Sequence, residues 1–153
     1  MSDQRLISPA IALPADQSPI TLKFQNYRNL ENNSTAACFD GGILEVSSNG
    51  GAFVQVTGTA LLNDPYRGLV SAQYENPLAG LNAWCEPSAG RPYADTLIDL
   101  TPYAGQSVQL RWRVGTDRSV NREGWYVDDI RVQGCAIGGG GGESIFSDGF
   151  ETH

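Results

Sequence analysis

The chain has very little of the side-chain chemistry on which most hydrolytic and nucleotide-binding proteins depend. It contains one histidine, His153, and one lysine, Lys23, among 153 residues. Nucleophilic triads usually take their base from histidine, and zinc sites take ligands from histidine and paired cysteines, so we expect neither. Gly138–Gly142 is not followed by Lys-Ser/Thr, which excludes a P-loop. The sequence singles out no catalytic residue.

Long apolar runs are also missing, so we expect no membrane-spanning helix. The stretch Met1–Arg5 has no apolar region, which predicts that no signal peptide is present in this sequence. Positive charge is scarce, since 17 Asp and Glu residues outnumber 10 Lys and Arg residues to give a net charge of -7. An acidic protein is a poor partner for nucleic acid or for anionic membranes, but it tolerates a divalent cation.

Turn-forming residues are plentiful, with 18 Gly and 8 Pro, whereas runs of strong helix formers are missing. Apolar and polar residues alternate over Ile20–Tyr27 and Val108–Val114, which predicts strands with one buried face. Asn49-Gly50 predicts a hairpin turn, because both residues accept positive φ angles. The expected fold class is therefore all-β, a two-sheet antiparallel β-sandwich with almost no helix.

The strand pattern ends after Cys135, and we expect residues 1–136 to form one sandwich domain. The run Gly138–Gly142 is typical of a flexible linker. Residues 137–153 are expected to comprise this linker and a short acidic tail, in which Ser144–His153 has no visible partner element.

Two adjacent carboxylates, Asp128 and Asp129, interrupt the otherwise strand-like stretch Gly124–Val132. Successive side chains of a regular strand point to opposite faces, so one of the two carboxylates should point towards the core. A buried carboxylate must be protonated, paired with a cation or bound to a metal. Two interpretations remain open: a metal site, or an ion pair with Arg111 or Arg113.

The three cysteines are Cys38, Cys85 and Cys135, and no two of them form a C-x-x-C pair. We expect one disulfide and one free thiol, which implies an oxidising, extracytoplasmic setting. Three reduced thiols are the alternative.

A series of short motifs runs in order between Ile20 and Val132. The motifs are Asp40-Gly41-Gly42 with Glu45-Val46-Ser47, Gly51-Ala52-Phe53, Asn76-Pro77-Leu78-Ala79-Gly80 with Ala83-Trp84, Leu100-Thr101-Pro102-Tyr103-Ala104-Gly105-Gln106, Leu110-Arg111-Trp112-Arg113 and Gly124-Trp125-Tyr126-Val127-Asp128-Asp129-Ile130. As a set they resemble the MAM-like jelly-roll domains attached to secreted bacterial peptidases and exoproteins of the immune inhibitor A type. The resemblance implies a non-catalytic role and a structural calcium near the loop ends.

By this resemblance the metal ligands are Glu31, Asp40 and Asp128, with Asp129 beside them. Calcium takes six to eight oxygen ligands, and loops at one end of a sandwich can bring distant carboxylates together. The chain departs from the family pattern at Trp84-Cys85-Glu86, which makes a local disulfide plausible. We expect Cys38 to pair with Cys85, because both flank loop motifs whereas Cys135 follows the last strand.

The function expected is that of a calcium-stabilised accessory domain in a secreted or cell-surface protein, with a parent enzyme domain, an extracellular protein or a glycan as partner. A carbohydrate-binding module and a cell-surface adhesion domain are the alternatives. Tyr66 and Trp84 lie in an irregular stretch and are the candidate sugar-binding residues, whereas Trp112 and Trp125 are expected in the core. Two carboxylates could also cleave sugars, but the sequence singles out no such pair.

Overall fold

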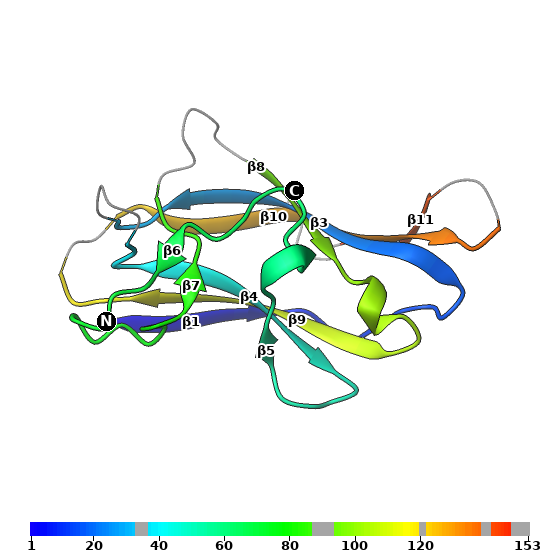
Figure 1. Cartoon of the computed structure of the whole chain (residues 1–153), viewed down its shortest axis with the longest axis horizontal. Coiled ribbons are helices and arrows are strands. Elements are labelled where there is room, and N and C mark those ends of the chain that lie inside the picture. Colours follow the sequence, from blue (N-terminus) through cyan, green and yellow to red (C-terminus); the bar gives the residue numbers. More distant parts are fainter. Residues whose placement is uncertain (33–36, 87–93, 120–121, 139–141, 148–153) are drawn as a thin grey trace.

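The computed structural model describes residues 1–32, 37–86, 94–119, 122–138 and 142–147. Two antiparallel sheets pack face to face as a sandwich (Figure 1). The first sheet has the order β1-β9-β4-β5, with β2 also paired to β9, and the second has the order β11-β10-β3-β8. The predicted all-β antiparallel sandwich is confirmed.

The first sheet comprises β1 (Ser2–Ile7), β2 (Ile11–Ala12), β4 (Gly41–Ser48), β5 (Val54–Gln55) and β9 (Ser107–Thr116). The second comprises β3 (Gln17–Asn29), β8 (Ala94–Asp99), β10 (Gly124–Ala136) and β11 (Gly142–Ser147). The short pair β6 (Gly68–Leu69) and β7 (Asn82–Ala83) and two 3₁₀ turns (Gly58–Ala60 and Thr101–Tyr103) complete the described elements. Among the described residues, no helix is long and apolar enough to cross a membrane.

Alternation in β3 and β9 builds most of the core. Ile20, Leu22 and Phe24 of β3 are fully buried and face Leu110 and Trp112 of β9. Phe24 meets Trp112 edge to face, with the ring centroids 5.6 Å apart. Both alternating stretches therefore bury the predicted face, and Trp112 lies in the core as expected.

The inward face of β3 then becomes polar, which the sequence analysis did not foresee. Asn26 and Arg28 continue the buried register and meet Asp64 and Thr96. Arg28 donates to both carboxylate oxygens of Asp64 at 2.9 Å, and the Thr96 hydroxyl donates to Oδ2 of Asp64 at 2.7 Å. Trp125 donates its indole N–H to Asn26 at 2.7 Å. This paired network anchors the irregular stretch around Asp64 to the second sheet.

The strand β10 is not regular, because its pairing with β3 shifts register between Asp128 and Arg131. One extra residue is inserted there, and Asp129 adopts a positive φ of 50°. A β-bulge of this kind changes which residues face inward. A regular strand would place Asp128 and Ile130 on the same face, but Asp128 is exposed and Ile130 is buried.

The described part of the predicted tail, Gly142–Ser147, is a strand of the second sheet, contrary to our expectation. Residues Gly142–Ser147 form β11, which pairs with β10 from Arg131 to Cys135. Ile145 and Phe146 are partly buried against the main core. The expectation that this segment has no partner element is therefore wrong.

Candidate metal centre

Three carboxylates meet at the end of the sandwich where β3 and β9 finish and β4 begins, at the left of Figure 1. They belong to Glu31, Asp40 and Asp117, and one oxygen from each lies within 4.8 Å of the others. Asp40 and Asp117 are almost fully buried, with 3% and 5% of their surface exposed. Three acids this close, two of them out of water, repel one another unless a proton or cation separates them.

The backbone pairing of the surrounding elements accounts for this convergence. Strands β4 and β9 are in register at Gly41 and Gly115, so the residues just outside that pair lie side by side. The backbone N–H of Asp40 donates to the carbonyl of Glu31 at 3.0 Å. The end of β3 is thus attached to the start of β4, and Asp117 follows directly from β9.

Hydrogen bonds orient the acids but leave one oxygen free. The N–H of Asp117 donates to Oδ1 of Asp40 at 2.9 Å, and the N–H and hydroxyl of Ser119 both donate to Oδ1 of Asp117 at 2.7 and 2.9 Å. Oδ2 of Asp117 is buried and has no hydrogen-bond partner among the described residues. A buried acceptor without a partner normally costs about 1–3 kcal/mol, so its retention calls for a ligand.

The electrostatics of the site favour an added positive charge. Burial raises the pKa of Asp40, and the nearby carboxylates of Asp117 and Glu31 raise it further, although the N–H of Asp117 opposes them. A divalent cation would reverse this effect by stabilising the ionised forms. Hard carboxylate oxygens at this spacing match Ca²⁺, whose bonds to oxygen are about 2.3–2.6 Å long, better than soft metals.

Close backbone packing holds the site in shape. The side chain of Asn76 donates to the carbonyls of Phe39 and Gly115 at 2.7 and 2.9 Å, which ties a long loop to the ends of two strands. A Cβ atom on Gly115 would clash with Oδ1 of Asn76. One on Gly42 would lie 2.8 Å from the ring of Trp125. These glycines are needed because no side chain fits.

The structure therefore brings together Glu31 and Asp40 of the predicted ligand set, but neither Asp128 nor Asp129. Asp128 pairs with Gln25 in the middle of the sheet, four residues along β10 from Gly124. At about 3.3 Å per residue this is roughly 13 Å from the strand end. The predicted inclusion of these two residues is wrong, because the bulge turns the backbone so that neither carboxylate needs a buried counter-ion.

Local partners satisfy both of these carboxylates. Asp128 accepts the N–H of Asp129 at 2.7 Å, and Asp129 pairs with Arg131 at 2.9 Å. The alternative partners, Arg111 and Arg113, instead pair with Glu45 and Asp3.

Asp117 is the candidate ligand that the sequence analysis missed. It lies in the polar loop after β9, and nothing in its immediate neighbours marks it as a ligand. The alternation of β9 does indicate where that strand ends, just before Asp117. The end of β9 lies beside the Asp40-Gly41-Gly42 motif only because β4 pairs with β9. That pairing is a tertiary property.

The predicted disulfide between Cys38 and Cys85 is present, and Cys135 is free. Both bonded residues are buried in a small second core with Leu30, Ile43 and Leu78, close to the acidic site. The disulfide links the segment before β4 to the segment after β7, so it stabilises the same end of the sandwich.

Of the two candidate sugar-binding residues, Trp84 is a core residue and Tyr66 is partly buried against the core. Trp84 is fully buried, and its ring packs 4.7 Å from that of Tyr66 and 6.0 Å from that of Phe24. Burial raises the pKa of Tyr66 to about 12, and its hydroxyl contacts the backbone of Leu44. The expectation that they form an exposed platform is wrong, because the irregular stretch folds over the sandwich.

Comparison with known proteins gives one informative match. No protein-family model matches the chain. The chain is similar to bacillopeptidase F of Bacillus subtilis (strain 168), with 27% identity over 137 residues. The match covers 90% of this chain but 7% of bacillopeptidase F, so the chain corresponds to a small segment of that protein.

Proposed function

We propose that this chain is a non-catalytic accessory domain, stabilised by calcium, of a secreted multidomain protein of the peptidase type. The observation that carries the calcium assignment is the buried, unpartnered Oδ2 of Asp117, which lies in a group with Glu31 and Asp40. These three residues would supply carboxylate oxygens, and loop carbonyls and water would complete the shell.

The accessory role is supported by the extent of the match. An independent all-β unit that corresponds to 7% of a protein named as a peptidase has the proportions of an added domain. The MAM-like resemblance predicts the same role and a calcium ion at the loop ends. The disulfide fits an oxidising compartment outside the cytoplasm.

The calcium assignment is tested by thermal melting of the chain with added Ca²⁺ and with chelator. A ligand that binds only the native state stabilises it by about 2.7 kcal/mol at a hundredfold excess over its Kd. Melting should therefore occur at a higher temperature with calcium, and Asp117→Asn should remove the difference. Asp128→Asn is the matched control and should retain it.

Equal melting temperatures in calcium and chelator, with no heat of binding in calorimetry, would rule out the calcium site. The non-catalytic role is tested separately. The calcium-loaded chain should leave an unfolded protein substrate intact, and cleavage by the purified chain would contradict that role.

A further inference from the structure

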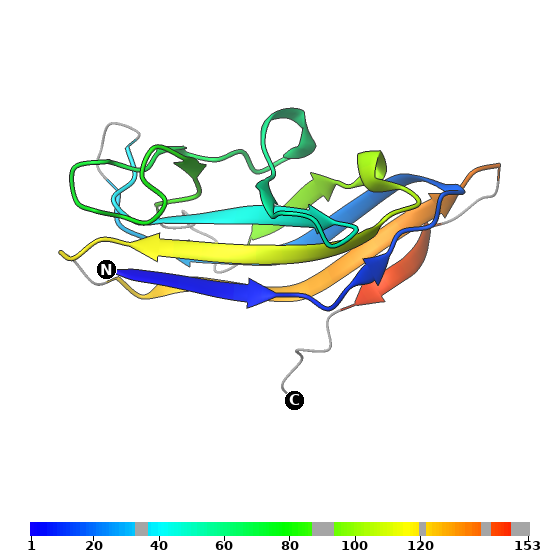
Figure 2. The same cartoon turned by 90° about the horizontal axis from the view of Figure 1, so that it is seen from below.

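A polar pocket of about 300 Å³ lies at the same end of the sandwich as the acidic site. Two segments supply its lining residues, which are Gln73, Tyr74, Glu75, Arg118 and Ser119. The first three belong to the loop between β6 and β7, and the other two directly follow Asp117. Figures 1 and 2 both show this loop (green) beside the end of β9 (yellow). None of the three grouped carboxylates lines the pocket, so it is a separate feature.

Specific contacts hold both walls of the pocket in place. On one wall, Ser119 donates its N–H and its hydroxyl to Asp117. On the other wall, the Tyr74 ring packs edge to face against Phe39, with the ring centroids 5.5 Å apart. The side chain of Asn76 ties the same loop to the carbonyl of Phe39 at 2.7 Å. Because the walls are fixed in advance, a ligand would lose little affinity to ordering them.

The charged members of the pocket are held side by side at its surface. Nη2 of Arg118 lies 3.1 Å from Oε2 of Glu75, and these side chains are 70% and 67% exposed. An ion pair this exposed adds little to the stability of the fold. Glu75 also has a positive φ of 60°, and residues held in such unfavourable conformations concentrate at functional sites. The pair is therefore better explained by a ligand than by stability.

The two charges select a neutral ligand that both donates and accepts hydrogen bonds. A guanidinium only donates and a carboxylate only accepts. An anion would be repelled by Glu75 and by the neighbouring acidic site, and a cation would be repelled by Arg118. Neighbouring hydroxyl groups of a sugar satisfy both side chains, because each hydroxyl donates and accepts. The amide of Gln73 also offers a donor and an acceptor.

Tyr74 adds an aromatic surface to these polar groups. Its side chain is 45% exposed, although its ring contacts Phe39. The face of an aromatic ring carries partial negative charge, so it attracts the C–H groups on the apolar face of a sugar ring. Ligand pockets usually measure about 300–1,000 Å³ and combine aromatic surface with a few convergent polar groups. This pocket has both properties.

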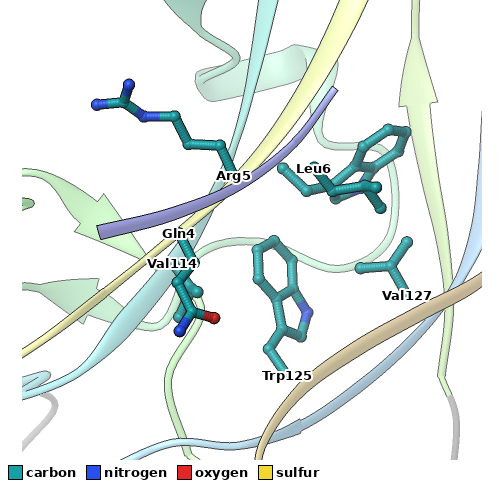
Figure 3. Close-up of a pocket in the computed structure, with 7 residues that line it drawn as sticks. Gln4, Arg5, Leu6, Val114, Trp125 and Val127 are labelled. Atoms are coloured by element: carbon teal, nitrogen blue, oxygen red, sulfur yellow. The ribbon is translucent and has the colours of Figure 1, made fainter. Parts of the chain in front are cut away.

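The cavity between the sheets beside β1, drawn in Figure 3, lacks this chemistry. It measures about 190 Å³, and apolar side chains such as Leu6 and Val127 line it. Among the described residues that line it, Arg5 alone is charged, and Arg5 is paired with Asp3 at 2.9 Å. Figure 3 shows the Arg5 side chain pointing away from the ring of Trp125. This cavity therefore presents no charged group with which to select a polar ligand.

We propose that the pocket between the β6–β7 loop and the residues after Asp117 binds one neutral sugar unit of a glycan. Glu75 accepts a hydrogen bond from one sugar hydroxyl, Arg118 donates to its neighbour, and the Tyr74 ring packs on the C–H face. This activity goes beyond the accessory role and does not rest on the calcium assignment.

Titration of the full chain with sugars, followed by nuclear magnetic resonance, tests the proposal. The probes are four neutral tetrasaccharides, built of glucose, mannose, galactose or N-acetylglucosamine, each raised to about 10 mM so that millimolar Kd values are detected. At least one should shift the ring signals of Tyr74 and the side-chain signals of Arg118 in a saturable manner. A Gly-Ser peptide, which offers backbone donors and acceptors without a sugar ring, should shift neither.

Variants locate the binding site. Tyr74→Ala should weaken the affinity about tenfold or more, whereas Tyr74→Phe keeps the ring and most of the affinity. Tyr126→Ala is the matched control, because Tyr126 is 47% exposed on a strand of the second sheet, and it should bind like the wild type. Arg118→Met changes a side chain that is 70% exposed, so it leaves the fold intact and should also weaken binding.

Three results would overturn the proposal. The first is that none of the four sugars shifts Tyr74. The second is that Tyr74→Ala and Arg118→Met bind as tightly as the wild type, or that Tyr126→Ala loses binding. The third is that the Gly-Ser peptide shifts Tyr74 as much as the sugars do, which would assign the pocket to a peptide. These results leave the melting experiment with calcium and chelator unaffected, so the two proposals fail separately.

Discussion

Asp40 accepts a hydrogen bond from the backbone N–H of Asp117, 2.9 Å from its Oδ1, although the two carboxylates repel each other across the same site. The backbone contact holds the acids together, and the charges push them apart. Both facts follow from where β4 begins and β9 ends. We expect the balance between them to make the stability of this end of the sandwich depend on protons and, under the proposed function, on calcium.

The first prediction concerns pH. Burial raises the pKa of Asp40 above its ordinary value of 3.8 in the folded chain, so the folded state holds this proton more tightly than the unfolded state does. The resulting stability is present below pH 3.8 and is lost as the pH rises through the raised pKa. In chelator, the free energy of unfolding, measured by fluorescence, should therefore contain a contribution from Asp40. This contribution should decrease as the pH rises from 3.8 through the raised pKa.

Calcium should act in the opposite direction, because protons compete with it for Asp40. The difference in melting temperature between calcium and chelator should narrow as the pH falls towards 4. In chelator, Asp40→Asn should remove the proton-linked contribution. A difference that stays constant from pH 7 to pH 4 would show that Asp40 does not bind the ion.

The second prediction concerns the disulfide between Cys38 and Cys85, which are 47 residues apart. In the chain-entropy model, closing a loop of this length stabilises the fold by about 4 kcal/mol. Replacing both residues by serine should lower the free energy of unfolding in urea by about 2–5 kcal/mol. Cys135→Ser is the control, because Cys135 is free and only partly buried. A loss of less than about 1 kcal/mol would contradict the prediction.

The third prediction concerns the buried ion pair between Arg28 and Asp64, joined by two hydrogen bonds of 2.9 Å. Arg28→Met leaves a carboxylate without its cation, and removing one partner of a buried pair costs about 3–5 kcal/mol. Arg131→Met is the matched control, since Arg131 pairs with Asp129 at the surface and should cost less than about 1 kcal/mol. Similar losses in chemical denaturation for both variants would refute this distinction.

The fourth prediction concerns close packing at Gly42. A Cβ atom there would lie 2.8 Å from the ring of Trp125, so Gly42→Ala should force the ring to shift and destabilise the chain by about 1–3 kcal/mol. Gly142→Ala is the control, because the nearest atom to its Cβ would be 3.9 Å away. Near-ultraviolet circular dichroism should change for Gly42→Ala alone, and an unchanged aromatic signal in that variant would show that the ring has room.

The fold could be predicted from sequence wherever a strand was regular. The alternation of Ile20–Tyr27 and of Val108–Val114 set the buried faces correctly, and the Asn49-Gly50 turn has the expected positive φ angles. The same rule failed at Asp128, because one extra residue reverses the alternation and no local feature announced the bulge.

The candidate site could be predicted only in part, because local motifs identify some of its residues and the pairing of distant strands brings in the others. Glu31 and Asp40 were identified through motifs, whereas Asp117 becomes a neighbour only when β4 and β9 pair over a separation of 77 residues. The buried position of Trp84 also depends on how an irregular stretch folds back, which periodicity does not encode. The positions of both residues depend on contacts between segments that are distant in the sequence, and local patterns do not predict such contacts.

The bond between Cys38 and Cys85 has a consequence for a chain exposed to proteolysis. A single backbone cut anywhere between these residues separates the sequence into two pieces that stay covalently joined. Such a nicked molecule would migrate as one species on a non-reducing gel and as two fragments after reduction. Damage in the long irregular stretch therefore does not by itself release either half of the sandwich.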